Sequence, residues 1–520
     1  MGVAPKTDSA VARLVSEYQI RIVMSESRIS QFYLSMLTDI RRRDSAGPSG
    51  RNLAMQAASD RGRVLFSAAF RRLQSKTQAF PQEWNASVRT RLTHSLEVAS
   101  IGRYLAEKIS EQLFEKGMLG EKNNIETLYR TNAFISFVEV SCLMHDLGNP
   151  PFGHFGEASI QEWFAARIEK NKEKFSKYHH SEFTQLYQDF TYFDGNPQGF
   201  RMATRLQWNK DEFGYNLTYS QLSATLKYPW TPERIGEVQN GKTVKKSGVF
   251  HSEKKILSEL QSKLSMNTMS RHPLSYIMEA ADDISYCLSD IEDALEKNIV
   301  RCYDVVFALR TGLGELNKNR IAMEILNSLP LEHSEDPAWF TAFRTTVTNV
   351  LVDRSCQLYI RHHAKIEAGE YFSLLDKSKA AKALLDIIRK FSKEYLYSSA
   401  VIRERELVGF QVVTGILDRF GLLLDLSSND AEQLLINKVQ PKATGSALAS
   451  TLQSFLPRKH IKVYEHTLLE IRKTKNSKKR FELLEWIARA HLIVDYLSGM
   501  TDDFAIVTYR RLYGGGANNI

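Results

Sequence analysis

Residues 145–157 read HDLGNPPFGHFGE and carry more information about fold and chemistry than any other part of this sequence. The stretch begins with an adjacent His145-Asp146 pair, continues with glycines and prolines that end a helix, and closes on His154 and Glu157. An imidazole beside a carboxylate suits a divalent metal of intermediate hardness, such as Mn, Fe, Co or Zn. A lone His-Asp pair is also common as a surface or capping pair. The metal interpretation therefore depends on partners elsewhere in the chain.

Two further segments offer such partners. Upstream, apolar residues at mostly helical spacing over residues 96–109 place His94 in the first turns of an amphipathic helix. Downstream, residues 273–297 are typical of a long helix with an apolar stripe of near-heptad period. Its opposite face carries Asp282, Tyr286 and Asp290 at intervals of four, which aligns two carboxylates and a phenol. For an isolated helix, the ordinary interpretation of that face is a solvated acidic surface.

The order His94, His145-Asp146, Asp282 is similar to the H…HD…D order of the HD-domain metal phosphohydrolases. The surrounding text resembles the bacterial deoxyguanosine triphosphate triphosphohydrolases in particular. The blocks that carry this resemblance are DRGR (60–63), FRRLQSKTQ (70–78), RTRLTHS (89–95), HDLGNPPFGHFGE (145–157), MEAADDISY (278–286) and DYLSGMTD (495–502). The resemblance runs from about residue 60 to residue 502 and does not extend to residues 1–51. The resemblance implies an all-α fold, with an HD-domain helical core and a helical C-terminal part.

The same resemblance implies a catalytic site with one divalent metal, Mn²⁺ or Mg²⁺ and also Co²⁺, and a proton-transfer group. The implied metal ligands are His94, His145, Asp146 and Asp282. Such a set leaves positions open for water and a phosphate oxygen. His154 is the implied general acid/base at the α-phosphate, and Glu157, three residues on, can orient its imidazole. The alternative for His154 is a helix cap.

Substrate contacts are also implied by resemblance, residue by residue. Gln78 and Asp290 match positions that hold the 3′-hydroxyl, and Tyr286 matches a phenol beneath the deoxyribose, where a 2′-hydroxyl would collide. Glu406 resembles a carboxylate that faces the N1 and N2 donors of guanine. The implied phosphate contacts are Arg91, Asn196, Lys227, Tyr228 and Lys246. The C-terminal arginine contacts of the family have no secure counterpart.

Composition indicates an ordinary globular protein. The chain has 520 residues, 43% of them hydrophobic and 25% charged. No run of eighteen apolar residues indicates a membrane span, and residues 1–23 lack the long apolar run of a secretory signal. The four cysteines are widely spaced in apolar helical contexts, which predicts buried thiols and a cytoplasmic location.

The positive balance of the chain predicts attraction to polyanions. The formal net charge is +9 and the sequence pI is about 9.1. This fits a highly phosphorylated small substrate, and it also fits single-stranded DNA, to which some members of the family respond. Basic clusters lie at residues 41–43, 242–246, 458–459 and 478–480, and each is also consistent with a solvated charged surface. The resemblance further implies a homo-oligomer, commonly a hexamer.

Apolar periodicity of the helical type dominates the chain. It predicts helices over residues 136–147, 222–228, 254–264, 273–297, 379–397, 430–439 and 480–497, with loops over 43–51, 193–199 and 231–248. We divide the chain into a partly flexible extension (1–54), an HD catalytic core (55–300) and a helical part (301–520) that completes the substrate pocket and makes oligomer contacts. No Pro/Gly/Ser tract separates the last two.

The resulting expectation is hydrolysis of dGTP to deoxyguanosine and tripolyphosphate. Three alternatives are a broader dNTP triphosphohydrolase, an HD-type phosphodiesterase or 5′-nucleotidase, and a regulatory nucleic-acid-binding module with a vestigial metal site. The presence of His154 and of every implied metal ligand weighs against the last.

Overall fold

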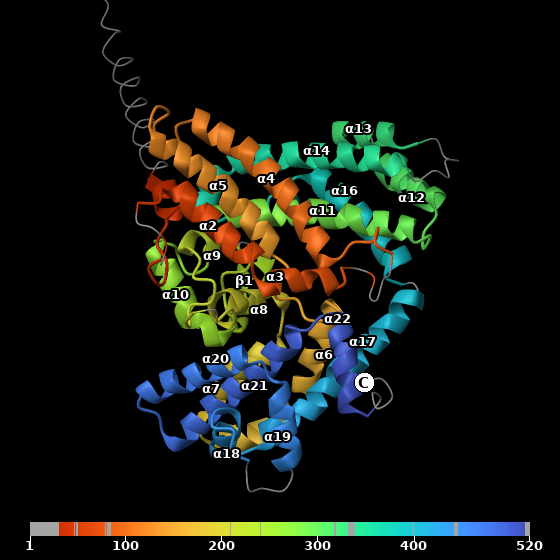
Figure 1. The fold of residues 1–520 in the computed structure, drawn as a ribbon. Coiled ribbons are helices and arrows are strands. Elements are labelled where there is room, and N and C mark those ends of the chain that lie inside the picture. The colour runs from red at the N-terminus through yellow and green to blue at the C-terminus, as the bar shows by residue number, and fades with distance from the viewer. Residues whose placement is uncertain are drawn as a thin grey trace, which may run out of the picture.

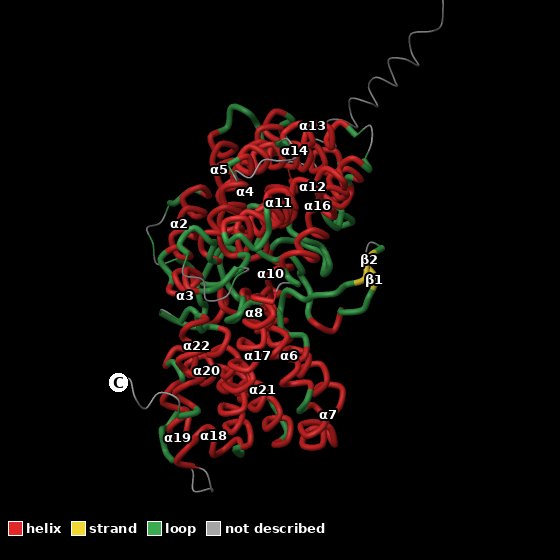
Figure 2. Tube along the Cα trace, turned by 90° about the vertical axis from the view of Figure 1, so that its right-hand side faces the viewer, coloured by secondary structure: helices red, strands yellow, loops and turns green. Residues whose placement is uncertain are grey.

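The structure is a computed structural model that describes residues 31–45, 47, 50–78, 80, 85–208, 210–239, 241–316, 319–330, 338–398, 400–440 and 446–514. Within this part of the chain the fold is helical (Figures 1 and 2), which confirms the predicted all-α class. The exceptions are two isolated bridges and one antiparallel hairpin, formed by β1 (Val238–Gln239) and β2 (Lys242–Thr243). The hairpin lies at the edge of the molecule (Figure 2).

The buried apolar residues form two clusters, which divide the molecule into a larger and a smaller lobe (Figure 1). The larger lobe contains α2 (Leu53–Leu65), α3 (Ala68–Arg72), α4 (Arg91–Glu115), α5 (Ile125–Met144), α9 (Tyr219–Ala224), α10 (Lys254–Lys263), α11 (Pro273–Glu296), α12 (Cys302–Gly314), α13 (Arg320–Ser328), α14 (Trp339–Arg361), α15 (His363–Glu367) and α16 (Lys379–Phe391). The smaller lobe contains α6 (His154–Ala165), α7 (Ile168–Thr191), α17 (Ala400–Phe420), α18 (Ser428–Leu435), α19 (Ser446–Phe455), α20 (Arg458–Lys473), α21 (Lys478–Ser498) and α22 (Asp502–Leu512). Short α8 (Gly195–Arg201) lies between the lobes.

Helices α4, α5 and α11 form the centre of the larger lobe. Thr90 begins α4 with a capping box, in which its side chain accepts from Thr93 N and Thr93 caps in return. Helix α11 begins with Pro273 at its first position, where the missing N–H costs nothing. Gly102 lets α4 approach α5 closely, because a Cβ at this position would lie 2.4 Å from the Cys142 sulfur. These helix starts and this close packing fix the three elements that carry the predicted metal ligands.

Aromatic packing builds the core of the smaller lobe. Tyr187 stacks on Trp486 with ring centroids 5.9 Å apart, and Phe164 stacks on Phe190 at 4.5 Å. These pairs join α6 and α7 to α21. Since α6 and α7 precede residue 200 whereas α21 follows residue 477, the smaller lobe combines a segment from the first half of the chain with its C-terminal helices (Figure 1).

Helix α17 and the turn after it contain a segment, Ile402–Asp425, that is long and apolar enough to cross a membrane by length and composition alone. Half of its most apolar window is buried inside the molecule. There it packs against α6 and α22, which is the arrangement of a core helix.

The predicted boundaries hold for α10, α11 and α21 and fail elsewhere. Helix α5 begins at Ile125 and ends at Met144, so the predicted segment 136–147 covers only its second half and runs past its end. Residues 222–228 are not one helix, because α9 ends at Ala224. Residues 195–199, predicted as loop, form most of α8, since Asp194 caps it. Helix α16 ends at Phe391 and is followed by a π turn, Ser392–Leu396, and α18 ends at Leu435 rather than at residue 439.

The domain division at residue 300 stays a prediction, and both core clusters draw on residues from either side of it. Most of the predicted extension, residues 1–30, lies outside the described residues. All four cysteines are thiols; three are buried and Cys302 is partly buried.

Candidate active site

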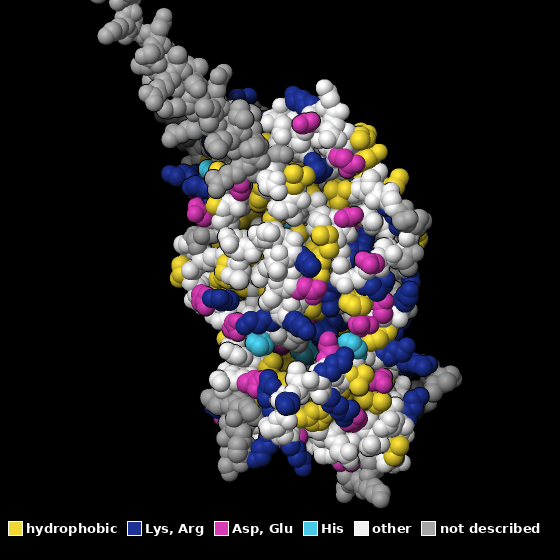
Figure 3. Space-filling model, turned by 90° about the vertical axis from the view of Figure 1, so that its left-hand side faces the viewer, with side chains coloured by type: hydrophobic (Ala, Val, Ile, Leu, Met, Phe, Trp, Pro, Cys, Tyr) yellow, Lys and Arg dark blue, Asp and Glu magenta, His cyan; other side chains and the backbone are white. Residues whose placement is uncertain are grey.

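A cavity of about 440 Å³ lies at the junction of the two lobes. Every residue predicted for the site lines it, although these residues span positions 78 to 406 in the chain. Residues that the sequence did not single out also line it, among them Thr77, Asp194 and Tyr397. On one face of the molecule, lysine and arginine side chains gather around the junction of the lobes (Figure 3).

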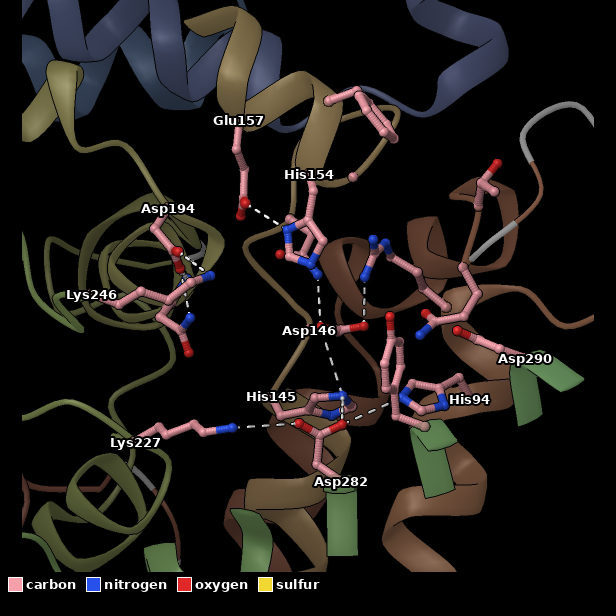
Figure 4. A pocket seen from close by; sticks show the side chains of 18 of the residues that line it. His94, His145, Asp146, His154, Glu157, Asp194, Lys227, Lys246, Asp282 and Asp290 are labelled. Carbon is pink, nitrogen blue, oxygen red and sulfur yellow. Dashed lines mark hydrogen bonds and ion pairs between the residues drawn. The ribbon is translucent and has the colours of Figure 1, made fainter. Parts of the chain in front are cut away.

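The four predicted metal ligands converge at one end of this cavity (Figure 4). His94 comes from the first turns of α4, His145 is the C-cap of α5, and Asp282 lies in the middle of α11. Asp282 Oδ1 is 3.6 Å from His94 Nε2 and 3.5 Å from His145 Nε2, and Asp146 Oδ1 is 3.6 Å from His145 Nε2. Ligands held about 2.1 Å from one ion lie roughly 3 to 3.5 Å apart. Ligand atoms of His94, His145 and Asp146 lie within 4.8 Å of one another and could hold one ion, and Asp282 lies beside both histidines.

Two further observations fit a bound cation. The ring nitrogen His145 Nδ1 lies 2.6 Å from the carbonyl oxygen of Cys142. A hydrogen on Nδ1 would donate to that carbonyl and leave the lone pair of Nε2 directed at the cluster. His145 Nε2 is buried and has no hydrogen-bond partner in the described part of the chain. A buried acceptor in this position is the group that a metal ion would satisfy.

Electrostatics keep the two carboxylates of the cluster ionised. Burial alone would raise the pKa of Asp146, but Arg91 and the neighbouring histidines lower it below its usual range. Burial likewise opposes ionisation of Asp282, whereas the histidines and Lys227 lower its pKa. Arg91 Nη1 donates to Asp146 Oδ2 over 2.6 Å. If Arg91 also binds phosphate, as predicted, its guanidinium would contact Asp146 and the phosphate at the same time.

His154 stands at the first position of α6 and points into the cavity (Figure 4). Its Nδ1 lies 2.7 Å from Glu157 Oε2, and the backbone N–H of Gly195 donates to Glu157 Oε1 over 2.7 Å. Glu157 is buried, whereas 72% of the His154 side chain is accessible. The hydrogen bond to Glu157 raises the pKa of His154 against the opposing effect of burial. Glu157 thus fixes the orientation of the His154 ring through Nδ1, and Nε2 points into the cavity.

A cationic wall faces this pair. Lys246 Nζ lies 2.6 Å from Asp194 Oδ2, and Asn196 Nδ2 donates to Asp194 Oδ1 over 2.6 Å. Lys227 Nζ is 3.8 Å from Asp282 Oδ2. Burial opposes the charged form of Lys227, but Tyr228 and the nearby carboxylates raise its pKa. Burial also opposes the charged form of Lys246, but Asp194 raises its pKa. Both lysines are therefore positively charged at neutral pH, and both line the cavity.

The opposite wall offers hydrogen-bond acceptors without partners. Tyr397 donates its hydroxyl hydrogen to Asp290 and shares a 2.6 Å hydrogen bond with the Tyr286 hydroxyl. The second Asp290 oxygen, Oδ1, and the Gln78 amide oxygen are buried with no partner among the described residues. Burial raises the pKa of Asp290 above its ordinary value, against the lowering effect of Tyr397. Two unpaired buried acceptors of this kind suit a hydroxyl donor.

Glu406, the residue predicted to face guanine, lies on α17 at the rim of the same cavity. Burial raises the pKa of its carboxyl above the ordinary value.

Sequence reasoning missed Tyr397 and Asp194. Tyr397 follows the π turn Ser392–Leu396, and nothing in its neighbourhood indicates that it meets α11. Asp194 had a usable signal, because an aspartate before Gly-Asn-Pro is typical of a helix N-cap.

The basic clusters have different surroundings. Lys246 lines the cavity, whereas Arg41 is buried against Asp60 and Arg480 pairs with Glu182 at 2.9 Å.

Comparisons with known proteins place this geometry in a family context. The model of the HD domain matches residues 91–191, which include His94, His145, Asp146 and His154 but not Asp282. The chain is 36% identical over 482 residues to the deoxyguanosinetriphosphate triphosphohydrolases of Salmonella schwarzengrund (strain CVM19633) and Salmonella typhi, covering 87% of this chain and 92% of each relative. It is 35% identical over 483 residues to the protein of the same name from Klebsiella pneumoniae subsp. pneumoniae, covering 87% of this chain and 93% of that relative.

Proposed function

The chain belongs to the deoxyguanosinetriphosphate triphosphohydrolases of the HD superfamily, and we propose that it hydrolyses dGTP to deoxyguanosine and tripolyphosphate in the cavity between its lobes. One observation carries the assignment to this cavity. The His94, His145, Asp146 and Asp282 cluster shares it with the held His154 imidazole, with two charged lysines and with two unpaired acceptors. Each of these features has a counterpart in the hydrolysis of a nucleoside triphosphate: the metal site and lysines for the phosphates, the imidazole for proton transfer and the acceptors for the sugar.

We propose that His94, His145, Asp146 and Asp282 hold one divalent ion, with Mn²⁺ or Mg²⁺ as the first choices and Co²⁺ as a further one. When bound, such an ion supplies a nucleophilic water and polarises the α-phosphate as a Lewis acid. Lys227, Lys246 and Arg91, with Asn196 and Tyr228, bind the polyphosphate oxygens.

His154 moves the proton. Water adds to the α-phosphorus and loses a proton to solvent, the bond from that phosphorus to the 5′-oxygen of the sugar breaks, and the tripolyphosphate keeps all three phosphorus atoms. The departing 5′-oxygen needs a proton, and protonated His154 donates it from Nε2. Glu157 accepts from Nδ1 over 2.7 Å and so fixes the ring with Nε2 toward the substrate. A raised pKa keeps more of His154 in the donating form at neutral pH.

The sugar and the base are read by the wall opposite the lysines. Asp290 Oδ1 and the Gln78 amide oxygen are positioned to accept from the 3′-hydroxyl. The Tyr286 ring, whose hydroxyl is hydrogen-bonded to that of Tyr397, is the group against which we propose that a 2′-hydroxyl collides. Glu406 accepts from the N1 and N2 donors of guanine, which adenine lacks at the equivalent positions.

Assembly and location are proposed separately. We infer a homo-oligomer, with a hexamer as the family implies, in the cytoplasm. The net charge of +9 supports binding of single-stranded DNA, and the four thiols support a reducing compartment. Light scattering tests the oligomer. DNA affinity should fall about tenfold or more between roughly 50 and 200 mM salt if several phosphates are contacted.

Product analysis tests the proposed reaction. The protein is incubated with each of the four dNTPs and with GTP, in Mn²⁺ or Mg²⁺, and the nucleoside and phosphate products are separated by chromatography. We expect deoxyguanosine and tripolyphosphate in equal amounts, with dGTP as the best substrate. Similar rates for all dNTPs would indicate the broader triphosphohydrolase. Release of orthophosphate from a deoxynucleoside monophosphate in place of tripolyphosphate would indicate a 5′-nucleotidase.

A further inference from the structure

We propose that Asp502, the first residue of α22, is a positioning residue that holds both the His154 segment and the Gln78 segment in their working geometry. Asp502 Oδ1 accepts from the backbone N–H of Phe152 over 3.0 Å. Its other oxygen, Oδ2, accepts from the backbone N–H of Thr77 over 3.1 Å and from the Thr77 hydroxyl over 2.5 Å. One buried carboxylate thus joins two loops that are separated by about 75 positions in the sequence and meet at the cavity.

The Phe152 connection matters because this segment is strained. Phe152 has φ 62°, a left-handed conformation that a bulky residue rarely adopts, and Gly153 follows with φ 58°. His154 is the next residue and begins α6. A backbone in this conformation persists only where its surroundings hold it. The carboxylate of Asp502 is one such restraint, applied two residues before the imidazole.

A second restraint acts on the Phe152 side chain. A Cβ built on Gly409 of α17 would lie 2.8 Å from the Phe152 ring, so the ring packs directly on the helix backbone. Both restraints therefore come from residues beyond position 400, far outside residues 91–191 that match the HD domain.

The Thr77 connection serves the other wall of the cavity. Thr77 precedes Gln78, whose unpaired amide oxygen is proposed to bind the 3′-hydroxyl. The preceding residue, Lys76, is tied to the same turn, because its buried Nζ donates to the Ser498 carbonyl over 2.7 Å and to the Asn149 carbonyl over 2.5 Å. The turn between α21 and α22 consequently fixes both loops from one side.

A simple capping role does not account for Asp502. Thr501 is the N-cap of α22 and accepts from Phe504 N over 3.3 Å. The next residue, Asp503, is an exposed acid in the same first turn, so the favourable charge at the helix start is already supplied. In the hydrogen bonds and ion pairs of the described residues, Asp502 contacts none of the four proposed metal ligands. Its removal should therefore affect proton transfer and sugar binding more than metal binding.

The test compares Asp502→Asn with Asp503→Asn, which removes the same charge one residue away. An amide has one acceptor oxygen, so asparagine at 502 can serve Phe152 or Thr77 but not both. Three quantities are measured on the full-length protein: kcat and KM for dGTP, the Kd for Mn²⁺ by titration calorimetry of metal-free protein, and the thermal melting midpoint. We expect kcat of Asp502→Asn to fall about 10- to 100-fold, because a displacement of the order of 1 Å costs that much. The Mn²⁺ Kd should stay within about twofold of the control.

A kcat within about twofold of Asp503→Asn would overturn the proposal. A parallel loss of Mn²⁺ binding would also overturn it, since Asp502 would then act on the whole site. If Asp502→Asn fails to fold, Asp502→Glu decides, because it keeps the charge and both acceptor oxygens but moves them by one methylene away from the N–H groups of Phe152 and Thr77. A lowered kcat with normal Mn²⁺ binding supports the proposal, and an unchanged kcat overturns it.

The inference rests on the proposed function, but the two can fail separately. The absence of tripolyphosphate from wild-type reactions would reject the function. Normal wild-type turnover with an unaffected Asp502→Asn variant would reject only the role of Asp502.

Discussion

Replacing Glu157 with Gln should move the alkaline limb of the pH–rate profile to lower pH. His154 donates a proton in the proposed reaction, so activity is present below its pKa and is lost as the pH rises through that pKa. The hydrogen bond from His154 Nδ1 to Glu157 Oε2, 2.7 Å long, is the main cause that raises this pKa. Glutamine keeps the acceptor for Gly195 N but removes the negative charge beside the imidazolium.

The size of the shift follows from the geometry. A hydrogen bond to a charged group contributes roughly 1.5 to 3 kcal/mol in proteins. Solvent reaches 72% of the His154 side chain, so screening favours the lower end of that range. Since about 1.4 kcal/mol corresponds to one pH unit, the limb should move by roughly one unit. The protonated form, and with it the activity, would then disappear at a lower pH in the variant than in the wild type.

The assay is kcat for dGTP, measured by deoxyguanosine release across about pH 5.5 to 9.5 at saturating Mn²⁺. His154→Ala is the control. Its kcat should fall about 10²- to 10⁴-fold, and its pH–rate profile should lack the alkaline limb that is assigned to His154. A limb that stays in place in Glu157→Gln would refute the coupling between the two residues. A limb that moves to higher pH would refute the role of His154 as proton donor.

Three further perturbations test other parts of the cavity. Mn²⁺ added to metal-free protein at about 100 times its Kd should raise the free energy of unfolding by about 2.7 kcal/mol. His145→Ala should lose both this stabilisation and dGTP hydrolysis, while its circular dichroism spectrum stays helical. Normal activity in that variant would reject the metal site. Tyr286→Ala should raise GTP hydrolysis relative to dGTP hydrolysis while lowering both in absolute rate, and an unchanged ratio would locate sugar discrimination elsewhere. Tyr397→Phe removes the hydroxyl shared by Asp290 and Tyr286 and should lower kcat/KM for dGTP about tenfold, or ~1.4 kcal/mol, whereas wild-type kinetics would show that the hydroxyl has no part in substrate binding.

The sequence predicted those parts of the fold whose signals are local. Helix α11 has a proline at its start and a near-heptad apolar stripe, so both its existence and its face could be read. The predicted helix 222–228 was wrong at its C-terminal end. Apolar and polar residues alternate with helical spacing over 225–228, but α9 ends with Thr225 as its C-cap, and Lys227 beyond it lines the cavity. Tertiary demands overrode the local pattern there.

The candidate site divides in the same way. His94, His145 and Asp282 stand in ordered blocks of sequence, and the cavity indeed brings them together. Tyr397 could not be found, because its partners lie more than 100 positions away and its own segment looks like the end of an amphipathic helix. Asp502 is hidden for a similar reason: in the sequence it is one of two acids at a helix start, and only the fold distinguishes it from Asp503.

The stretch 145–157 also explains why the C-terminal part belongs to the catalytic site. Its first half packs with the larger lobe, where Leu147 joins the core formed by α4, α5 and α11. Its second half packs with the smaller lobe, where Phe152 joins the core built by α17, α21 and α22. The proposed metal ligands His145 and Asp146 are therefore fixed by one core, and the proposed proton donor His154 by the other. The distance between metal and proton donor depends on how the lobes are joined, so substitutions at the α21–α22 turn should change kcat without touching a ligand.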